Sequence, residues 1–344
     1  MFTLKSLQRA VVGAPMAGGP STAALAAAVS NAGGLGFLAA GYKSPAVLDA
    51  DITAARALTD RPFGVNLFVP DAVNTGGAGT SGQVAAALAY REQLGRDYPP
   101  ELLPLPDPED DDGWAAKLDL VRRQQVPVVS FTFGLPGRDV IAALQDAGSA
   151  VAVTVTTAAE AVLAVSAGAR MLCVQGPDAG GHRGTFDAAA EPAEQPLVEL
   201  TGAVRTAVSP DVELIAAGGI STAAQVRTLR AEGADAVQIG TALLLSPEAG
   251  TAAVHRAALQ DPQFTHTALT RAFSGRTARG LANRFMAAHP DAPAAYPLVN
   301  QMTKALRAQA AAASDPHGTS LWAGTGYRSA LPEPAAAVVA RLGV

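Results

Sequence analysis

Short apolar segments alternate along the chain with alanine-rich segments of helical spacing, and this alternation is what most limits the possible folds. Strand-length apolar runs separated by helices indicate parallel βαβ units. The expected strands cover residues 10–14, 34–39, 63–69, 127–131, 150–155, 171–175, 213–217 and 236–239. The expected helices between them cover residues 22–31, 45–58, 137–147, 158–167, 194–208 and 222–232. Eight such strands favour an α/β fold, a closed (β/α)8 TIM barrel, over an open sheet.

Two parts of the chain depart from this alternation. The connection after the third expected strand, at about residues 70–114, is long and contains one expected helix at 82–94 and the acidic run 109–112. Such a connection is usually an active-site elaboration or a disordered insert, and a solvated loop accounts for the acidic run at least as well. After residue 248 no strand pattern returns, and helices are expected at 249–260, 278–288, 296–313 and 334–342. We therefore expect a barrel domain at 1–248, which includes the insert, and helical segments at 249–344 that form part of a smaller, substrate-covering cap.

The composition fits a globular enzyme and argues against two classes of partner. A net charge of -5 and an aromatic fraction of 5% provide neither a basic groove nor base-stacking platforms, so nucleic acid is not an expected partner. No apolar stretch reaches the ~18 residues of a membrane span, and the N-terminus lacks a signal-peptide pattern. We expect a soluble, cytoplasmic protein without a membrane partner.

Glycines follow the last two expected strands, in LIAAGGIS at 214–221 and AVQIGTALL at 236–244. In (β/α)8 barrels the loops after the seventh and eighth strands frequently bind phosphate. Gly218, Gly219 and Gly240 would let backbone N–H groups approach an oxyanion without a Cβ in the way. The sequence therefore predicts a site for a phosphorylated ligand.

Three further residues, in or directly after expected strands, could either contact a ligand or pack in the core. Met16 follows the first strand in APMAGG, where contact with a flat ligand and core filling are about equally expected. Asn66 is polar within the apolar strand VNLF, and its amide needs partners that a ligand could supply. Cys173, the single cysteine, is flanked by Leu172 and Val174 and is expected to be a buried strand residue.

His182 is the strongest candidate for a catalytic group, since it follows the sixth strand in the glycine-rich loop GPDAGGHRG. An imidazole there suits a general base that removes a carbon-bound proton, and a structural loop histidine is the alternative. The other histidines lie in the C-terminal segments and are expected at the surface: His255, His266, His289 and His317.

Metal and Schiff-base chemistry find little support. Asp178 and His182 are four residues apart, but no second histidine is near enough in sequence to complete a usual ligand set. None of the four lysines follows an expected strand, which disfavours a Schiff base. We expect no metal, and redox chemistry by a bound cofactor remains.

Several motifs, in the same order, resemble those of the nitronate monooxygenase family, formerly called 2-nitropropane dioxygenases, in its class I branch. They are APMAGGPSTAALAAAVSNAGGLGFLAAGY, PFGVNLF, CVQGPDAGGHRG, AAGGISTAAQVRTLRAEGADAVQIGTALL and RAFSGRTARGLANRF. The likeness runs from about residue 11 to 322 and is weakest at 70–126. It implies an FMN-dependent TIM barrel that oxidises alkyl nitronates, such as propionate 3-nitronate, with O2 to a carbonyl compound and nitrite.

The resemblance also implies roles for individual residues. His182 matches the family's catalytic histidine. The cofactor-binding positions are Met16 and Ala17 beside the flavin ring, Asn66 and Gln175 as polar contacts to the flavin, Gln238, and, around the phosphate, Gly180, Gly181, Gly218, Gly219, Gly240 and Thr241. Tyr296, Asn300 and Lys304 have the i, i+4, i+8 spacing of one helix face, which resembles the face that closes the substrate pocket. A solvated face accounts for Lys304 equally well, and Asn300 stands where some members have Tyr, which leaves the substrate range open.

Other functions stay open at this point. One is NAD(P)H:quinone or enoyl reduction on the same FMN barrel, although no GxGxxG motif opens a helix after a strand. Another is a non-redox barrel that binds a phosphorylated ligand. The expected partners are a small nitronate or nitroalkane and O2, with a homodimer possible.

Overall fold

In the computed structural model, which describes residues 2–70 and 81–343, eight parallel strands form one barrel-shaped sheet in the order β1-β9-β8-β6-β5-β4-β3-β2. They are β1 (Val11–Gly13), β2 (Gly36–Ala39), β3 (Phe63–Phe68), β4 (Val128–Thr132), β5 (Ala150–Val155), β6 (Met171–Gln175), β8 (Glu213–Ala217) and β9 (Ala236–Ile239). A parallel bridge between Val12 and Leu35 joins the first and last strands of that order, β1 and β2. The eight expected strands and the TIM-barrel fold are therefore confirmed.

Helices surround the barrel at the expected places. They are α1 (Ala23–Asn31), α2 (Pro45–Leu58), α6 (Arg138–Asp146), α7 (Ala158–Ser166), α8 (Leu197–Ala207) and α9 (Ala223–Ala231). The side chains of Thr22, Ser44, Thr157 and Thr222 accept hydrogen bonds from the first turns of α1, α2, α7 and α9. Such caps satisfy N–H groups that have no partner within the helix. The sequence pattern does not predict a further helix, α5 (Trp114–Arg123), which packs Leu120 and Val121 into the core beneath β3 and β4.

The segment after residue 248 contains strands, so the expectation that no strand returns there is wrong. Its elements are α10 (Ala253–Gln260), β10 (Thr267–Thr270), β11 (Ala278–Leu281), α11 (Arg284–Ala288), α12 (Leu298–Ala312) and α13 (Ala335–Leu342). The expected helix at 278–288 is a strand in its first half. β11 pairs antiparallel with β10 and with β7 (Gly181–His182), and this pairing with a distant loop overrides local helix propensity.

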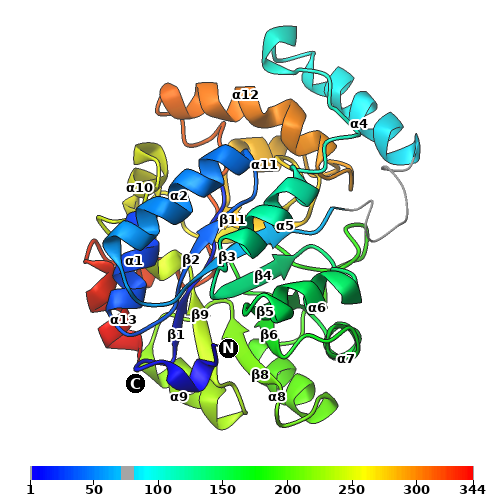
Figure 1. Cartoon of the computed structure of the whole chain (residues 1–344). Coiled ribbons are helices and arrows are strands. Elements are labelled where there is room, and N and C mark those ends of the chain that lie inside the picture. Colours follow the sequence, from blue (N-terminus) through cyan, green and yellow to red (C-terminus); the bar gives the residue numbers. More distant parts are fainter. Residues whose placement is uncertain (1, 71–80, 344) are drawn as a thin grey trace.

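Helices α12 and α4 (Ser81–Leu94) lie together beyond one end of the barrel, whereas α13 lies beside α1 on its outer wall (Figure 1). Tyr90 on α4, Leu298 and Met302 on α12, and Phe273 share one buried cluster. Four short 3₁₀ segments complete the described elements: η1 (Leu4–Ser6), η2 (Pro100–Leu102), η3 (Thr241–Leu243) and η4 (Tyr327–Ser329). Within residues 2–70 and 81–343, no helix has the length and apolar character needed to cross a bilayer.

Candidate active site

A cavity of about 1070 Å³ opens where the carboxyl ends of the barrel strands meet α12. Residues from nearly every strand end contribute to its wall. All the site residues expected from the sequence line it: Met16, Ala17, Asn66, Gln175, Gly180, Gly181, His182, Gly218, Gly219, Gln238, Gly240, Thr241, Tyr296, Asn300 and Lys304. The fold thus brings these residues together around one space.

The glycine-rich ends of β8 and β9 present unused backbone donors. Among the described residues, the N–H groups of Gly219, Gly240 and Thr241 donate to no protein acceptor. Gly219 has a φ of 69°, in the left-handed region that favours glycine. Gly181 has a φ of 77°, and an added Cβ there would have no atom within 4 Å. Free donors beside open space fit an oxyanion such as a phosphate.

The amide side chains of Gln175 and Asn66 in the cavity wall have partners in the protein. Gln175 Oε1 accepts from the Gly184 N–H at 2.8 Å, and its Nε2 donates to the His182 carbonyl at 3.0 Å. Asn66 Nδ2 donates to Ser130 Oγ at 2.9 Å and to Thr132 Oγ1 at 3.0 Å. Gln175 therefore fixes the loop that carries His182, a role that the sequence did not indicate.

Gln238 and Cys173 meet inside the barrel. Gln238 Nε2 lies 3.4 Å from Cys173 Sγ, and Cys173 is buried as expected. Burial raises the pKa of this thiol to about 12. Cys173 therefore stays protonated and does not act as a nucleophile at neutral pH.

His182 is held by a hydroxyl and enclosed by rings. Its Nε2 lies 2.8 Å from Ser274 Oγ, and its ring centroid is 5.3 to 5.9 Å from those of Trp322, Phe133 and Tyr296. Burial, followed by the charges of Arg276 and Arg307, lowers the pKa of the imidazole to about 3. His182 is therefore neutral near pH 7, and one ring nitrogen carries no proton.

Two guanidinium groups that sequence reasoning missed lie close to His182. Arg276 is 1% exposed, donates to the carbonyl oxygens of Arg183 and Thr185, and stacks over the Phe133 ring at 4.3 Å. Arg307 Nη2 donates to Asn300 Oδ1 at 2.8 Å. Both had a signal in the sequence, since Arg276 belongs to the motif RAFSGRTARGLANRF and Arg307 follows Asn300 by two helical turns. Together they make the surroundings of His182 electropositive, which suits an anionic substrate.

The three residues expected on one helix face occupy different settings. Tyr296 precedes the first residue of α12, Leu298, so the expectation that it lies on this helix is wrong. Asn300 is buried, while Lys304 is exposed at the cavity edge. All three line the cavity because the chain enters α12 directly above it.

The expectation that the C-terminal histidines lie at the surface is wrong for two of them. His255 on α10 is 9% exposed and lines the cavity, and His289 packs its ring 4.5 Å from that of Phe285. Burial lowers the pKa of His255 to about 4, and among the described residues its Nε2 has no hydrogen-bond partner. His266 is exposed, as expected.

The comparison that decides the family is a match of the nitronate monooxygenase family model to residues 2–343. The chain belongs to the nitronate monooxygenase family. The nitronate monooxygenase of Pseudomonas aeruginosa is 39% identical, with 98% of this chain and 96% of that protein covered. A nitroalkane oxidase from Streptomyces ansochromogenes superposes with a TM-score of 0.90 at 45% identity, over 98% of this chain and 96% of that one.

FabK from Thermotoga maritima is a more distant structural relative, with a TM-score of 0.74 at 25% identity over 98% of this chain and 93% of that one. Membership of the nitronate monooxygenase family makes the chain a flavin-dependent oxidoreductase. It supports oxidative denitrification of alkyl nitronates as the activity.

Proposed function

We propose that this nitronate monooxygenase binds FMN in the cavity and oxidises alkyl nitronates, such as propionate 3-nitronate, with O2 to a carbonyl compound and nitrite. The observation that carries the proposal is a single cavity lined by free backbone donors, a neutral imidazole and Arg307, with the buried Arg276 guanidinium stacked on the Phe133 ring of its wall. The donors suit a phosphate and the cations suit a nitronate.

The residues present fit FMN. The free N–H groups of Gly219, Gly240 and Thr241 would hold the phosphate, and Gly181, where an added Cβ would meet no atom within 4 Å, leaves room beside them. Gly180 and Gly218 allow the close packing of these loops, because a Cβ there would meet protein backbone at 2.4 and 3.0 Å. Met16, whose N–H donates to Ser21 Oγ at 2.8 Å, and Ala17 would lie beside the ring system. Asn66, Gln175 and Gln238 would face it from the barrel strands. When bound, FMN supplies the electron transfer and the reaction with O2.

His182 would lie beside the carbon that bears the nitro group. With its lowered pKa the imidazole is a weak base, and it would accept the proton of a nitroalkane only as the negative charge of the nitronate develops beside it; next to a preformed nitronate it would orient the group without transferring a proton. Arg276 and Arg307 oppose a positive charge on His182 when no anion is bound. A nitronate brings its own negative charge, so this electrostatic arrangement favours nitronates over neutral nitroalkanes.

Substituting the imidazole separates these two roles. In His182→Asn, turnover of a nitroalkane should fall much more than turnover of the matching nitronate, because only the nitroalkane needs a base. Nitrite release measures both rates. Equal rates for variant and parent with both substrates would refute His182 as the base.

The cofactor and the reaction class are tested on the purified protein. A flavin absorption spectrum, with FMN as the released flavin and nitrite formed from propionate 3-nitronate, supports the proposal. Under anaerobic conditions, rapid bleaching of the flavin by NADH or NADPH but not by a nitronate would instead favour a reductase. A colourless protein that FMN does not reconstitute would favour a non-redox barrel.

A further inference from the structure

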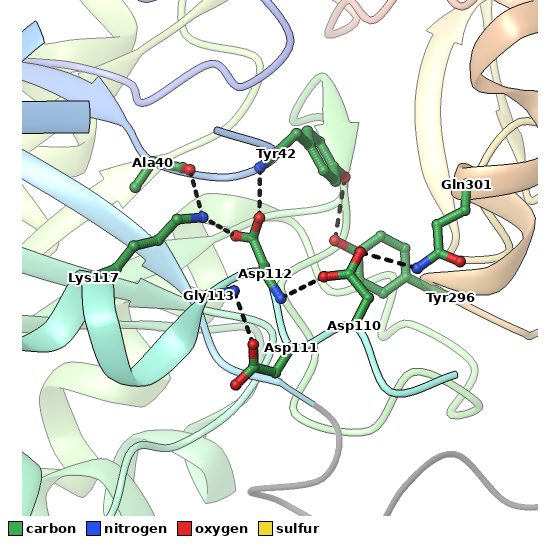
Figure 2. A network of polar contacts seen from close by, with 9 residues as sticks. All are labelled: Ala40, Tyr42, Asp110, Asp111, Asp112, Gly113, Lys117, Tyr296 and Gln301. Atoms are coloured by element: carbon green, nitrogen blue, oxygen red, sulfur yellow. Dashed lines mark hydrogen bonds and ion pairs between the residues drawn. The ribbon is translucent and has the colours of Figure 1, made fainter. Parts of the chain in front are cut away.

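One polar network reaches the cavity from outside the barrel, through Tyr42, which follows β2 (Figure 2). Tyr42 lines the cavity, and its hydroxyl oxygen lies 3.2 Å from the hydroxyl oxygen of Tyr296. The Tyr296 ring centroid is 5.9 Å from that of His182. A pair of phenols therefore stands beside the imidazole.

The phenol pair has one hydrogen-bond donor to spare. Burial raises the pKa of both tyrosines, so both hydroxyls are protonated at neutral pH. Their mutual hydrogen bond uses one of the two protons. Tyr296 is the phenol beside His182, whereas the Tyr42 ring packs on Phe68 at 5.5 Å. Either hydroxyl can donate in this contact. When Tyr42 donates to Tyr296, the Tyr296 proton is left for an acceptor beside the imidazole.

The backbone of Tyr42 is held in an uncommon conformation by Asp112. Tyr42 has a φ of 66°, in the left-handed region that is unfavourable for a bulky residue. Its N–H donates to Asp112 Oδ1 at 2.9 Å. The other carboxylate oxygen, Oδ2, lies 2.8 Å from Lys117 Nζ. The position of the Tyr42 hydroxyl thus depends on a carboxylate outside the barrel.

Lys117 anchors this carboxylate from the first turns of α5. It is 1% exposed, and Nζ also donates to the Ala40 carbonyl at 3.0 Å. Desolvating an ion pair is costly, and an apolar pair often gives a protein equal or greater stability. The contribution of this charged pair is therefore geometric, because it fixes residues 40–42 against α5.

The acidic run is consequently more than a solvated loop. Glu109, Asp110 and Asp111 are exposed, as expected, but Asp112 is half-buried in its pair with Lys117. Gln301 on α12 donates to Asp110 Oδ2 at 3.1 Å, so the same segment also contacts the helix that follows Tyr296 (Figure 2). The run therefore contacts Tyr42 itself and the helix that follows Tyr296.

We propose that Tyr42 is a positioning residue for substrate binding: held by Asp112 and Lys117, its hydroxyl fixes that of Tyr296 as the hydrogen-bond donor to the nitro group. The inference rests on the proposed function, because it assigns how the substrate is oriented at the same site.

The test measures binding separately from turnover. 2-Methyl-2-nitropropane has a nitro group but no hydrogen on the adjacent carbon, so it cannot form a nitronate and reports binding alone. Its dissociation constant is measured by calorimetry on the flavin-loaded protein. Nitrite release from a nitronate gives kcat and KM in parallel, and the flavin content and unfolding temperature of each variant are recorded.

Hydroxyl deletion should show that the two phenols act as one unit. Tyr42→Phe should weaken binding of the nitro compound about fivefold, the effect of one neutral hydrogen bond. Tyr296→Phe should weaken it at least as much, and Tyr42→Phe/Tyr296→Phe no more than Tyr296→Phe alone. Tyr98→Phe, at a half-buried tyrosine outside the cavity, should leave binding unchanged.

Two double variants at the ion pair isolate the acceptor for the Tyr42 N–H. Asp112→Asn/Lys117→Met removes both charges and the Lys117 anchor but keeps a side-chain oxygen for the Tyr42 N–H, and should bind more weakly than the parent but more tightly than Tyr42→Phe. Asp112→Ala/Lys117→Met differs by that oxygen and should bind as weakly as Tyr42→Phe, with raised KM and similar kcat. Because both double variants lack the buried Lys117 cation, a difference between their dissociation constants does not come from loss of the ion pair.

Equal binding by these two double variants, or normal binding by Tyr42→Phe, would overturn the inference while leaving the proposed function intact. A parent protein that neither binds the nitro compound nor oxidises nitronates would overturn both.

Discussion

Acid should destabilise the folded protein through His182 and His255, and two substitutions should remove that effect. Both imidazoles have an ordinary pKa of 6.5, which burial lowers to about 3 in His182 and about 4 in His255. Because these two imidazoles bind protons more weakly in the folded state, lowering the pH below 6.5 stabilises the unfolded state relative to the folded state. The contribution of each neutral histidine to the unfolding free energy is fully present above pH 6.5. It is lost progressively as the pH falls to about 3 for His182 and about 4 for His255.

The size of the effect follows from the two pKa values. One pKa unit corresponds to about 1.4 kcal/mol, and pH 5 lies 1.5 units below the ordinary histidine pKa, so each group should cost about 2 kcal/mol at pH 5 relative to pH 8. Together they should cost about 4 kcal/mol, a large share of the ~5–15 kcal/mol that stabilises a typical domain.

Urea unfolding followed by tryptophan fluorescence gives the unfolding free energy at about pH 5 and about pH 8, from the midpoint and slope of each transition. His182→Asn/His255→Gln should lose about 4 kcal/mol less than the parent between pH 8 and pH 5, whatever its absolute stability. His266→Gln, at an exposed histidine, is the matched control and should lose as much as the parent. If the double variant loses as much as the parent, both imidazoles titrate normally in the fold and the reasoning from burial is wrong.

Three further substitutions test the cofactor site, a helix cap and the core. Gly181→Val should lower the flavin bound per chain, because its side chain would stand in the cavity at a φ of 77°; the ratio of flavin to protein absorbance measures this, and full occupancy would contradict it. Thr222→Ala should reduce the unfolding free energy by about 1 kcal/mol, since it removes the capping box of α9, and urea midpoints should show this with nitrite release unchanged. Phe273→Ala should cost about 3–5 kcal/mol because this ring is fully buried and stacks on Phe285 at 4.6 Å; a loss under about 1 kcal/mol in the same assay would contradict it.

The barrel could be predicted because its strands are buried on both faces. All six residues of β5 are buried, and such a continuous apolar run between helices is typical of a strand in a parallel sheet that helices cover. The small sheet could not be predicted in the same way. β7 has two residues, Gly181 and His182, and its partner β11 lies almost a hundred residues away in the sequence. Non-local pairing of such short segments leaves no periodic signal.

Some site residues could be predicted from the sequence and others could not, for the same reason. His182 and the glycines follow barrel strands, whose ends meet at one edge wherever the barrel closes. Arg276, Arg307 and Tyr42 approach His182 only because β11, α12 and the loop after β2 fold over that edge. Asp112 and Lys117 look like solvated charges in the sequence, since three acidic residues precede the first and two arginines follow the second on its helix. Their pairing depends on how α5 packs against residue 40, which a single sequence does not show.

The short strand that contains His182 has a consequence for how small molecules enter. His182 is tied to β6 through the Gln175 amide and to β11 through the antiparallel ladder. A movement of the β10–β11 hairpin would therefore displace the imidazole of His182 from its position at the carboxyl ends of the barrel strands. Entry and release of small molecules that leave His182 in place must therefore occur without movement of this hairpin.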